Sequence, residues 1–240
     1  AKLYQYNHTN AQLFNIQVLI PEAIKSVVFD HEYYASKYPS VATEYGSSQA
    51  KLYEHFTKFG LMEGKQASPV FSVVHYLQNN SSVLSKCGNH YTAAMLHYYS
   101  TGRNTKGLKT APAADLGSKF EATINHTSAN INIGIASTAT HTDNNAWNVQ
   151  TVAASDTDAK QIWVFTRNAD GSYTLTNKAY PNAAMDTSGV AIADATNIAT
   201  YTNTGVDDEH RHWYFFERTP GNYVISPAHS SGKVVDISGG

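Results

Sequence analysis

The sequence predicts a mainly β protein joined to a small all-α domain. Two observations lead to this fold class: one pattern recurs after fifty residues in the last third of the chain, and another recurs after 42 residues in the first half. Repeats of about 20 to 50 residues are typical of folds assembled from equivalent units. With 240 residues, the chain can hold one or two domains that each bury a core.

The fifty-residue repeat occupies residues 161–240. Its first copy has the landmarks Gln161-Ile162-Trp163, Asp170-Gly171-Ser172-Tyr173 and Asp186-Thr187-Ser188-Gly189, and its second copy has Arg211-His212-Trp213, Gly221-Asn222-Tyr223 and Asp236-Ile237-Ser238-Gly239. The Asp170-Gly171 step allows the positive φ that a tight turn requires. The apolar residues that follow alternate with Thr, Val or Ser, as in half-buried strands. Each copy therefore predicts a unit that opens with a β-hairpin.

An earlier stretch predicts a preceding unit of the same kind. Alternating apolar residues indicate strands at residues 120–124, 131–135 and 147–149, and Gln161-Ile162-Trp163 closes the unit. Phe120 lies 53 residues before Tyr173, so this unit has a slightly longer loop. Residues 110–118, with Pro112 and several small residues, predict a linker before it.

These landmarks resemble the Gln-x-Trp, Gly-x-Tyr and hydrophobic-x-Asp-x-x-Gly pattern of ricin B-chain-like β-trefoil lectins. The resemblance implies three units around a pseudo-threefold axis and one potential sugar pocket in each unit. In such a pocket an Asp accepts hydrogen bonds from two sugar hydroxyls, and an aromatic ring stacks on the sugar. The residues implied in this way are Asp186, Tyr201 and His210 in unit two, and Asp236, Tyr4 and Asn10 in unit three.

Unit one departs from the family pattern, because Gly134 and Val152 stand where the Asp and the aromatic residue are expected. No sugar binding by this mechanism is expected there. The resemblance also implies that Trp163, Trp213 and Phe14 belong to the core. An alternative for Asp186 and Asp236 is a role as turn formers, since Asp before Ser-Gly favours local backbone hydrogen bonds.

The third unit is expected to be split between the two ends of the chain. Residues 223–240 supply its front half, and residues 1–20 carry a Gln-x-aromatic landmark typical of a back half. We expect closure within one chain, with Tyr4 opposite Asp236. A fragment cut from a tandem array and strand exchange with a neighbouring molecule are the alternatives. The expected domains are residues 1–20, 21–112 and 113–240.

The 42-residue repeat predicts short helices. Phe29, Tyr34, Val41, Gly46, His55, Phe56 and Gly60 recur as Phe71, Tyr76, Val83, Gly88, His97, Tyr98 and Gly102. Asp30 is a candidate helix N-cap, Ser47 or Ser48 is a candidate cap of a later helix, and Pro39 and Gly46 are helix boundaries. The two copies, residues 29–65 and 71–107, are expected to share one core that contains Phe29, Tyr34, Leu52, Phe56, Phe71, Tyr76 and Tyr98.

The first helical copy resembles a short repeat found beside cell-wall hydrolase and adhesin domains in secreted bacterial proteins. No chemistry is implied by that resemblance. Because His55 and His97 occupy the same position in both copies, they are expected to share a packing or hydrogen-bonding role.

Composition gives no support to several function classes. The net charge is −2 and 15% of residues are charged, so a role driven by basic charge at nucleic acid or a membrane surface has no support. The single cysteine, Cys87, excludes an internal disulfide or a multi-thiolate metal site. No cofactor and no metal are expected, since His210 and His212 alone are too few ligands. No apolar run approaches the ~20 residues of a membrane span. The N-terminus lacks a signal-peptide pattern, which suggests a mature or excised chain.

The function expected from these features is that of a non-catalytic carbohydrate-binding module of a secreted, extracellular bacterial protein. Galactose-type glycans are the sugars that the resemblance implies. One alternative is a structural or protein-interaction segment with a degenerate trefoil. Another is an accessory fragment of a larger glycan hydrolase.

Overall fold

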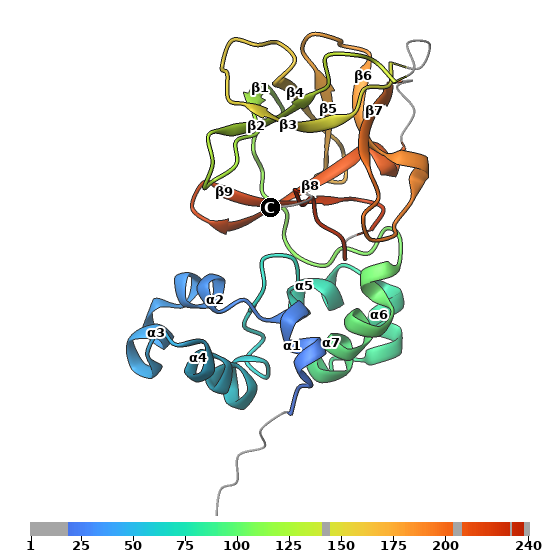
Figure 1. The fold of residues 1–240 in the computed structure, drawn as a ribbon. Helices are drawn as coiled ribbons and strands as arrows, with labels where there is room; N and C mark the ends of the chain where they lie inside the picture. The colour runs from blue at the N-terminus through green and yellow to red at the C-terminus, as the bar shows by residue number, and fades with distance from the viewer. Residues whose placement is uncertain (1–18, 141–144, 204–207, 231, 238–240) are drawn as a thin grey trace, which may run out of the picture.

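The computed structural model describes residues 19–140, 145–203, 208–230 and 232–237. The α-helices lie before residue 105, and the strands lie after residue 118 together with two short 3-10 helices (Figure 1). This arrangement confirms the predicted fold class, a mainly β protein with a helical domain. None of the helices described between residues 19 and 237 combines the length and the apolar character needed to cross a bilayer.

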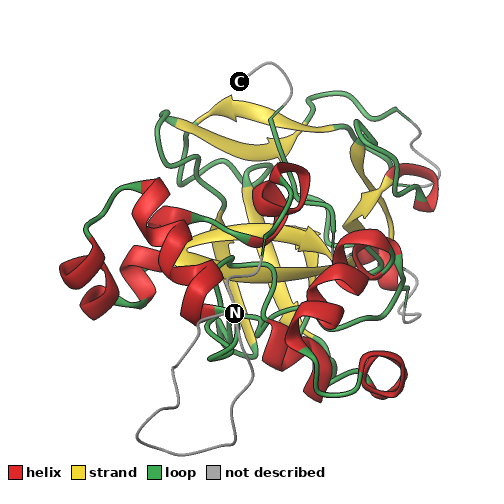
Figure 2. Ribbon diagram, turned by 90° about the horizontal axis from the view of Figure 1, so that it is seen from below, coloured by secondary structure: helices red, strands yellow, loops and turns green. Residues whose placement is uncertain are grey.

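The helical domain consists of two groups of three helices, preceded by one helix. In the described part of the chain the helices are α1 Glu22–Val28, α2 His31–Lys37, α3 Pro39–Tyr45, α4 Gln49–His55, α5 Val73–Gln78, α6 Ser81–Cys87 and α7 Tyr91–Ser100. A π-helical turn, η1 (Phe56–Gly60), extends α4, and a 3-10 helix, η2 (Gly102–Asn104), follows α7. Figure 1 shows the helices below the strands, and Figure 2, seen from below, shows them in two groups.

The helix boundaries follow from local chemistry. The Asp30 carboxylate accepts hydrogen bonds from the backbone N–H groups of Glu32 and Tyr33 at the start of α2. Pro39 begins α3, where its missing N–H costs nothing. Gly46 ends α3 with a φ of 84°, and the Ser48 hydroxyl caps α4. The predicted caps and boundaries are therefore confirmed.

One buried cluster holds both helical copies together. It contains all seven residues expected in the shared core: Phe29, Tyr34, Leu52, Phe56, Phe71, Tyr76 and Tyr98. The expected shared role of the two histidines is also confirmed. The Tyr34 hydroxyl lies 2.9 Å from His55 Nδ1, and the Tyr76 hydroxyl lies 2.8 Å from His97 Nδ1.

The two tyrosines also explain a repeated glycine. A Cβ atom on Gly60 would lie 2.2 Å from the Tyr34 hydroxyl, and one on Gly102 would lie 1.9 Å from the Tyr76 hydroxyl. Real Cβ contacts are never this short, so a larger residue would displace the ring. Each helical copy therefore needs a glycine at this point to let its tyrosine reach its histidine.

The β domain is built of hairpins. The strands are β1 Lys119–Thr123, β2 Ile131–Ile135, β3 Val149–Ala153, β4 Ile162–Arg167, β5 Tyr173–Asn177, β6 Ala183–Thr187, β7 Ile198–Thr202, β8 His212–Thr219 and β9 Asn222–Pro227. All described pairings are antiparallel: β1 with β4, β2 with β3, β4 with β5, β5 with β6 and β8, β6 with β7, and β8 with β9. Gly171, in the turn between β4 and β5, has the positive φ (89°) that the sequence predicted.

One predicted strand is wrong in its position. Residues 147–149 were expected to form the third strand of unit one, but β3 begins at Val149 and continues to Ala153. Trp147 precedes the strand, where its ring stacks on Tyr180 at 4.1 Å between ring centroids. The apolar pattern indicated that this tryptophan is buried but did not show that the strand begins two residues later.

Two tryptophans fix the centre of the β domain. Trp163 on β4 and Trp213 on β8 are both fully buried. The indole N–H of Trp163 donates to the carbonyl of Ile133 at 2.8 Å, and that of Trp213 donates to the carbonyl of Met185 at 3.1 Å. Burial and bonding thus repeat with the sequence, and the core role expected for both residues is confirmed. Phe14 lies outside the described residues.

Candidate functional site

The hairpin of β6 and β7 carries the two central residues of the predicted site in unit two. Asp186 lies opposite Ala199, and Tyr201 lies opposite Ala184. Because directly paired residues point to the same side of a sheet, Asp186 and Tyr201 share one face as diagonal neighbours. The hairpin thus brings the expected carboxylate and aromatic ring together.

An arginine connects the two side chains. Arg211 Nε lies 3.0 Å from Asp186 Oδ2, and the guanidinium carbon lies 5.4 Å from the centre of the Tyr201 ring. The guanidinium also reaches Asp208, with Nη1 3.2 Å from Oδ2. His210 Nε2 lies 3.4 Å from Asp186 Oδ2. Asp186, Arg211, His210 and Tyr201 therefore form one cluster, called the unit-two cluster below.

Burial differs sharply within the unit-two cluster. Asp186 is 6% exposed and Arg211 is 7% exposed, whereas Tyr201 is 40% exposed. Burial raises the pKa of the Asp186 carboxyl above its usual range, and the contacts with Arg211 and His210 offset only part of this effect. The cluster therefore combines a buried ion pair, Asp186 with Arg211, with an aromatic ring that faces solvent.

Sequence reasoning missed Arg211. A signal was present, because Arg211 takes the first place of the Gln-x-Trp landmark, where Gln161 stands in unit one. The two residues contact equivalent partners: Gln161 Nε2 donates to Asp158, and Arg211 pairs with Asp208. The additional contact of Arg211 with Asp186 depends on burial and on a fold in three dimensions, which the sequence pattern does not encode.

Unit one is tightly packed at the position that corresponds to Asp186. A Cβ atom on Gly134 would lie 3.1 Å from Val152 Cγ2, 3.2 Å from Gln161 Cγ and 3.2 Å from the Lys160 carbonyl oxygen. The Val152 and Gln161 side chains would have to move by a few tenths of an ångström to admit even a Cβ atom. This packing agrees with the expectation that unit one does not bind by the Asp-plus-aromatic mechanism.

The predicted site in unit three is described only in part. Asp236 is exposed and lies beside a hollow of about 620 Å³ whose lining includes Val149, Ile198, Ile225 and Val235. Tyr4 and Asn10 lie outside the described residues. The pocket predicted from these three residues therefore stays a prediction. Among the described residues, no three His, Cys, Asp or Glu side chains gather as they would around a metal ion.

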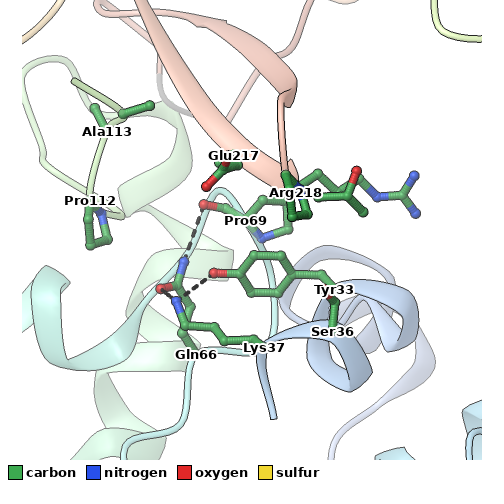
Figure 3. A pocket seen from close by; sticks show the side chains of 12 residues that line it. Tyr33, Ser36, Lys37, Gln66, Pro69, Pro112, Ala113, Glu217 and Arg218 are labelled. Atoms are coloured by element: carbon green, nitrogen blue, oxygen red, sulfur yellow. Dashed lines mark hydrogen bonds between the residues drawn. The ribbon is translucent and has the colours of Figure 1, made fainter. Parts of the chain in front are cut away.

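A further hollow of about 390 Å³ lies where the two domains meet (Figure 3). Lys37 Nζ donates to the Tyr33 hydroxyl at 2.8 Å and to Gln66 Oε1 at 2.7 Å, and the Gln66 amide donates to the carbonyl of Pro69. These polar groups satisfy one another.

At the edge of the same hollow, Arg218 of β8 joins the β domain to the helices. Its guanidinium contacts the carboxylate of Asp30 at 2.7 Å and that of Glu32 at 2.9 Å. Burial alone would raise the pKa of Asp30, but Arg218 and two backbone N–H groups hold it below its usual value. The hollow is therefore best understood as a domain junction.

The geometry defines a class of protein: a β domain of repeated hairpin units around buried tryptophans, with helices attached. Residues 159–240 match the family model of ricin-type β-trefoil lectin domain-like sequences. The C-terminal region therefore carries a ricin-type β-trefoil lectin-like domain. A search of curated proteins found no match.

Several solved structures are similar to parts of the chain. A designed threefold-symmetric protein, ThreeFoil, is 20% identical with a TM-score of 0.40, over 45% of this chain and 72% of its own. A Polyporus squamosus lectin, solved with a human-type influenza-binding epitope, is 20% identical with a TM-score of 0.40, over 50% of this chain and 40% of its own. An exo-β-1,3-galactanase from Clostridium thermocellum is 20% identical with a TM-score of 0.36, over 50% of this chain and 24% of its own.

Proposed function

We propose that this chain is a non-catalytic carbohydrate-binding module. The observation that carries the proposal is the placement of Asp186 and Tyr201 on one face of the β6–β7 hairpin, with the Tyr201 ring 40% exposed. The match of residues 159–240 to a lectin-like family supports the same class of ligand. A solvent-facing ring beside polar groups suits a sugar, whose C–H face stacks on the ring while its hydroxyls form hydrogen bonds.

Each residue of the unit-two cluster has its own role in the proposed site. Tyr201 is the platform for the sugar ring, and the Arg211 guanidinium against its ring holds the platform in place. His210, whose side chain is 17% exposed, is a polar group beside Asp186 that reaches solvent. Asp186 keeps a single conformation through Arg211, and its carboxylate accepts from a sugar hydroxyl that takes the place of the 3.4 Å contact with His210.

The proposal extends to the second site and to the setting of the protein. Asp236, Tyr4 and Asn10 form the unit-three pocket. Two shallow polar pockets bind weakly one at a time, so avidity comes from simultaneous binding to a repeated glycan. Galactose-type glycans are the preferred class, and the module acts outside the cell in a secreted bacterial protein. The helical domain is the short repeat that accompanies cell-wall and adhesin domains.

A second candidate function is a structural or protein-interaction segment that has lost its sugar sites. The observation that favours it is the buried pair of Asp186 and Arg211, which already satisfies the carboxylate in the absence of a sugar. A third candidate, an accessory part of a larger glycan hydrolase, keeps the same binding chemistry and places catalysis elsewhere.

A glycan array with the full chain separates these candidates. The carbohydrate-binding proposal predicts retention on a related set of glycans that share one terminal sugar, with stronger retention at high glycan density. Absence of binding to every glycan at high density would leave the structural candidate. Release of reducing ends from a bound polysaccharide by the purified chain would contradict the non-catalytic assignment.

A further inference from the structure

A pair of stacked rings in the β domain is replaced by two small side chains in the next unit. The Trp147 ring stacks on the Tyr180 ring with 4.1 Å between the ring centroids. The residue that corresponds to Tyr180 is Ser230, fifty residues later. Trp147 lies two residues before β3, and Thr196 lies two residues before β7, the equivalent strand. Two hydroxyl side chains, those of Thr196 and Ser230, therefore stand where two aromatic rings stack.

The backbone shows that Tyr180 and Ser230 hold equivalent positions. The Tyr180 N–H donates to the carbonyl of Asn177 at 3.2 Å, and the Ser230 N–H donates to the carbonyl of Pro227 at 3.1 Å. The carbonyls of Tyr180 and Ser230 each accept from the N–H group three residues later, at 2.8 and 3.0 Å. Because both hydrogen bonds of this turn recur, the two positions differ chiefly by the ring that Ser230 lacks.

A hollow lies where the rings are lost. Its volume is about 330 Å³, and Thr196 and Ser230 both line it. Protein interiors contain few voids larger than a water molecule. Pockets for small organic ligands begin at about 300 Å³. The hollow therefore has the size of a site for one small ring-shaped molecule.

A buried hydroxyl in the lining has no partner. Among the described residues, four buried side-chain polar atoms lack a hydrogen-bond partner, and two of them, His229 Nδ1 and Ser230 Oγ, belong to neighbouring residues. Ser230 is fully buried. A buried polar group without a partner is rare and destabilises the folded state. A ligand with a polar group beside Ser230 Oγ would remove this cost.

The rest of the lining selects the chemistry of the ligand. Most of it is apolar and includes Ile198, Trp213 and Val235. Four of the other polar side chains already have a partner: Thr187, Asp194, Thr196 and Lys233. The remaining one, Asp236, is exposed to solvent. The hollow thus offers an apolar wall and one buried hydroxyl that a ligand can satisfy.

This combination suits an aromatic alcohol better than a sugar. A pyranose carries hydroxyl groups around its ring, and most of them would face aliphatic side chains without a partner. A phenol has an apolar ring and one hydroxyl, so the single hydroxyl of Ser230 satisfies its hydrogen-bonding group.

We propose that this hollow binds a phenol, with the ring against Ile198, Trp213 and Val235 and the phenolic hydroxyl hydrogen-bonded to Ser230 Oγ. The bound ring replaces those that Trp147 and Tyr180 supply between units one and two. Free phenols and the tyrosine side chain of a partner protein share this chemistry. The site uses no residue of the unit-two cluster, so it is independent of glycan binding.

Titration of the full chain with p-cresol, followed by NMR at the indole N–H signals, tests the proposal. Trp213 lines the hollow, whereas Trp147 and Trp163 lie elsewhere in the β domain. The Trp213 signal should shift and saturate while the other two stay in place. Ser230→Ala should weaken p-cresol binding about two- to tenfold, because one hydrogen bond is lost. Toluene, which has no hydroxyl, should bind no more weakly to this variant than to the wild-type chain. Ser188→Ala, outside the hollow, is the matched control and should change nothing.

A second variant fills the space. Ser230→Tyr restores the ring of unit two and should abolish binding; if that variant does not fold, Thr196→Trp should do the same from another part of the lining. Unchanged affinity in the folded variant would overturn the proposal, as would a Trp213 signal that p-cresol does not shift up to its solubility limit. A Trp213 shift produced by methyl galactoside in place of p-cresol would overturn it too, because the hollow would then hold a sugar. If N-acetyltyrosinamide binds as tightly as p-cresol, the ligand is a tyrosine side chain of a partner, and if only p-cresol binds, it is a free phenol.

Discussion

Replacing Asp186 by alanine should destabilise the β domain through the arginine that it leaves behind. Arg211 is 7% exposed, so without Asp186 its charge loses a buried partner. Removing one partner of a buried ion pair lowers the free energy of unfolding by about 3–5 kcal/mol. Because Asp208 still contacts Arg211 at 3.2 Å, we expect the low end, about 3 kcal/mol. In a chain of this size such a loss lowers the melting temperature by about 6–12 °C.

The assay is urea unfolding followed by tryptophan fluorescence. All three tryptophans, Trp147, Trp163 and Trp213, are buried in the β domain, so their emission reports on that domain alone. Asp194→Ala is the matched control, because Asp194 pairs with Lys233 but its side chain is 94% exposed. The control should leave the unfolding midpoint unchanged.

A double-mutant cycle isolates the mechanism. Arg211→Met removes the charge while keeping the volume of an unbranched side chain. The double variant with Asp186→Ala should cost at least about 1 kcal/mol less than the sum of the two single variants, since neither charge of the Asp186–Arg211 pair then stays buried without the other. Additive single effects would refute the idea that Asp186 acts chiefly by neutralising Arg211. The cycle also matters for binding assays, because loss of glycan binding in Asp186→Ala alone does not separate a lost ligand contact from a loosened site.

Three more predictions concern other parts of the chain. Gly60→Ala should lower the melting temperature of the helical domain, because its Cβ would lie 2.2 Å from the Tyr34 hydroxyl. Circular dichroism at the helix band measures this change. Adding Tyr34→Phe to Gly60→Ala should restore part of the loss, and no restoration would contradict the clash. The stability of the helical domain should fall as the pH drops below 6.5, since burial lowers the pKa values of His55, His75 and His97 below the ordinary 6.5. As the pH falls, the histidines of the unfolded chain take up protons before those of the folded chain. This contribution to stability is therefore fully present above pH 6.5 and is lost as the pH falls toward the lower pKa values of the folded state. A stability that stays constant between pH 5 and 7 would contradict this prediction. Gly134→Asp should destabilise unit one without creating a sugar site, because its Cβ would lie only 3.1–3.2 Å from Val152, Gln161 and the Lys160 carbonyl oxygen. A stable variant with added glycan binding would show that unit one lacks only a carboxylate.

Much of the fold could be predicted because corresponding residues of the repeats lie at a fixed spacing in the sequence. Trp163 and Trp213 stand fifty residues apart and make the same indole hydrogen bond, so one unit predicts the other. The tyrosine–histidine contacts in the helical domain could be anticipated only as a shared role. The repeat shows that His55 and His97 are equivalent but does not show which side chain each one contacts.

The candidate site was harder to predict for a physical reason. The family resemblance gave Asp186 and Tyr201, and the hairpin register places them together. The burial of Asp186 depends on Arg211, which arrives from a segment 25 residues away and whose charge has no counterpart in Gln161. Long-range ion pairs of this kind leave no periodic signal in the sequence.

Calorimetric titration with a glycan retained on the array tests the central claim most directly. Tyr201→Ala removes the platform, and Tyr99→Ala removes an equivalent ring in the helical domain, where the Arg103 guanidinium lies 4.5 Å from the ring centre. The account predicts that Tyr201→Ala weakens binding at least about tenfold, or about 1.4 kcal/mol, while Tyr99→Ala leaves it unchanged. Equal affinity in the wild-type chain and both variants would contradict the assignment of the unit-two cluster as a carbohydrate site.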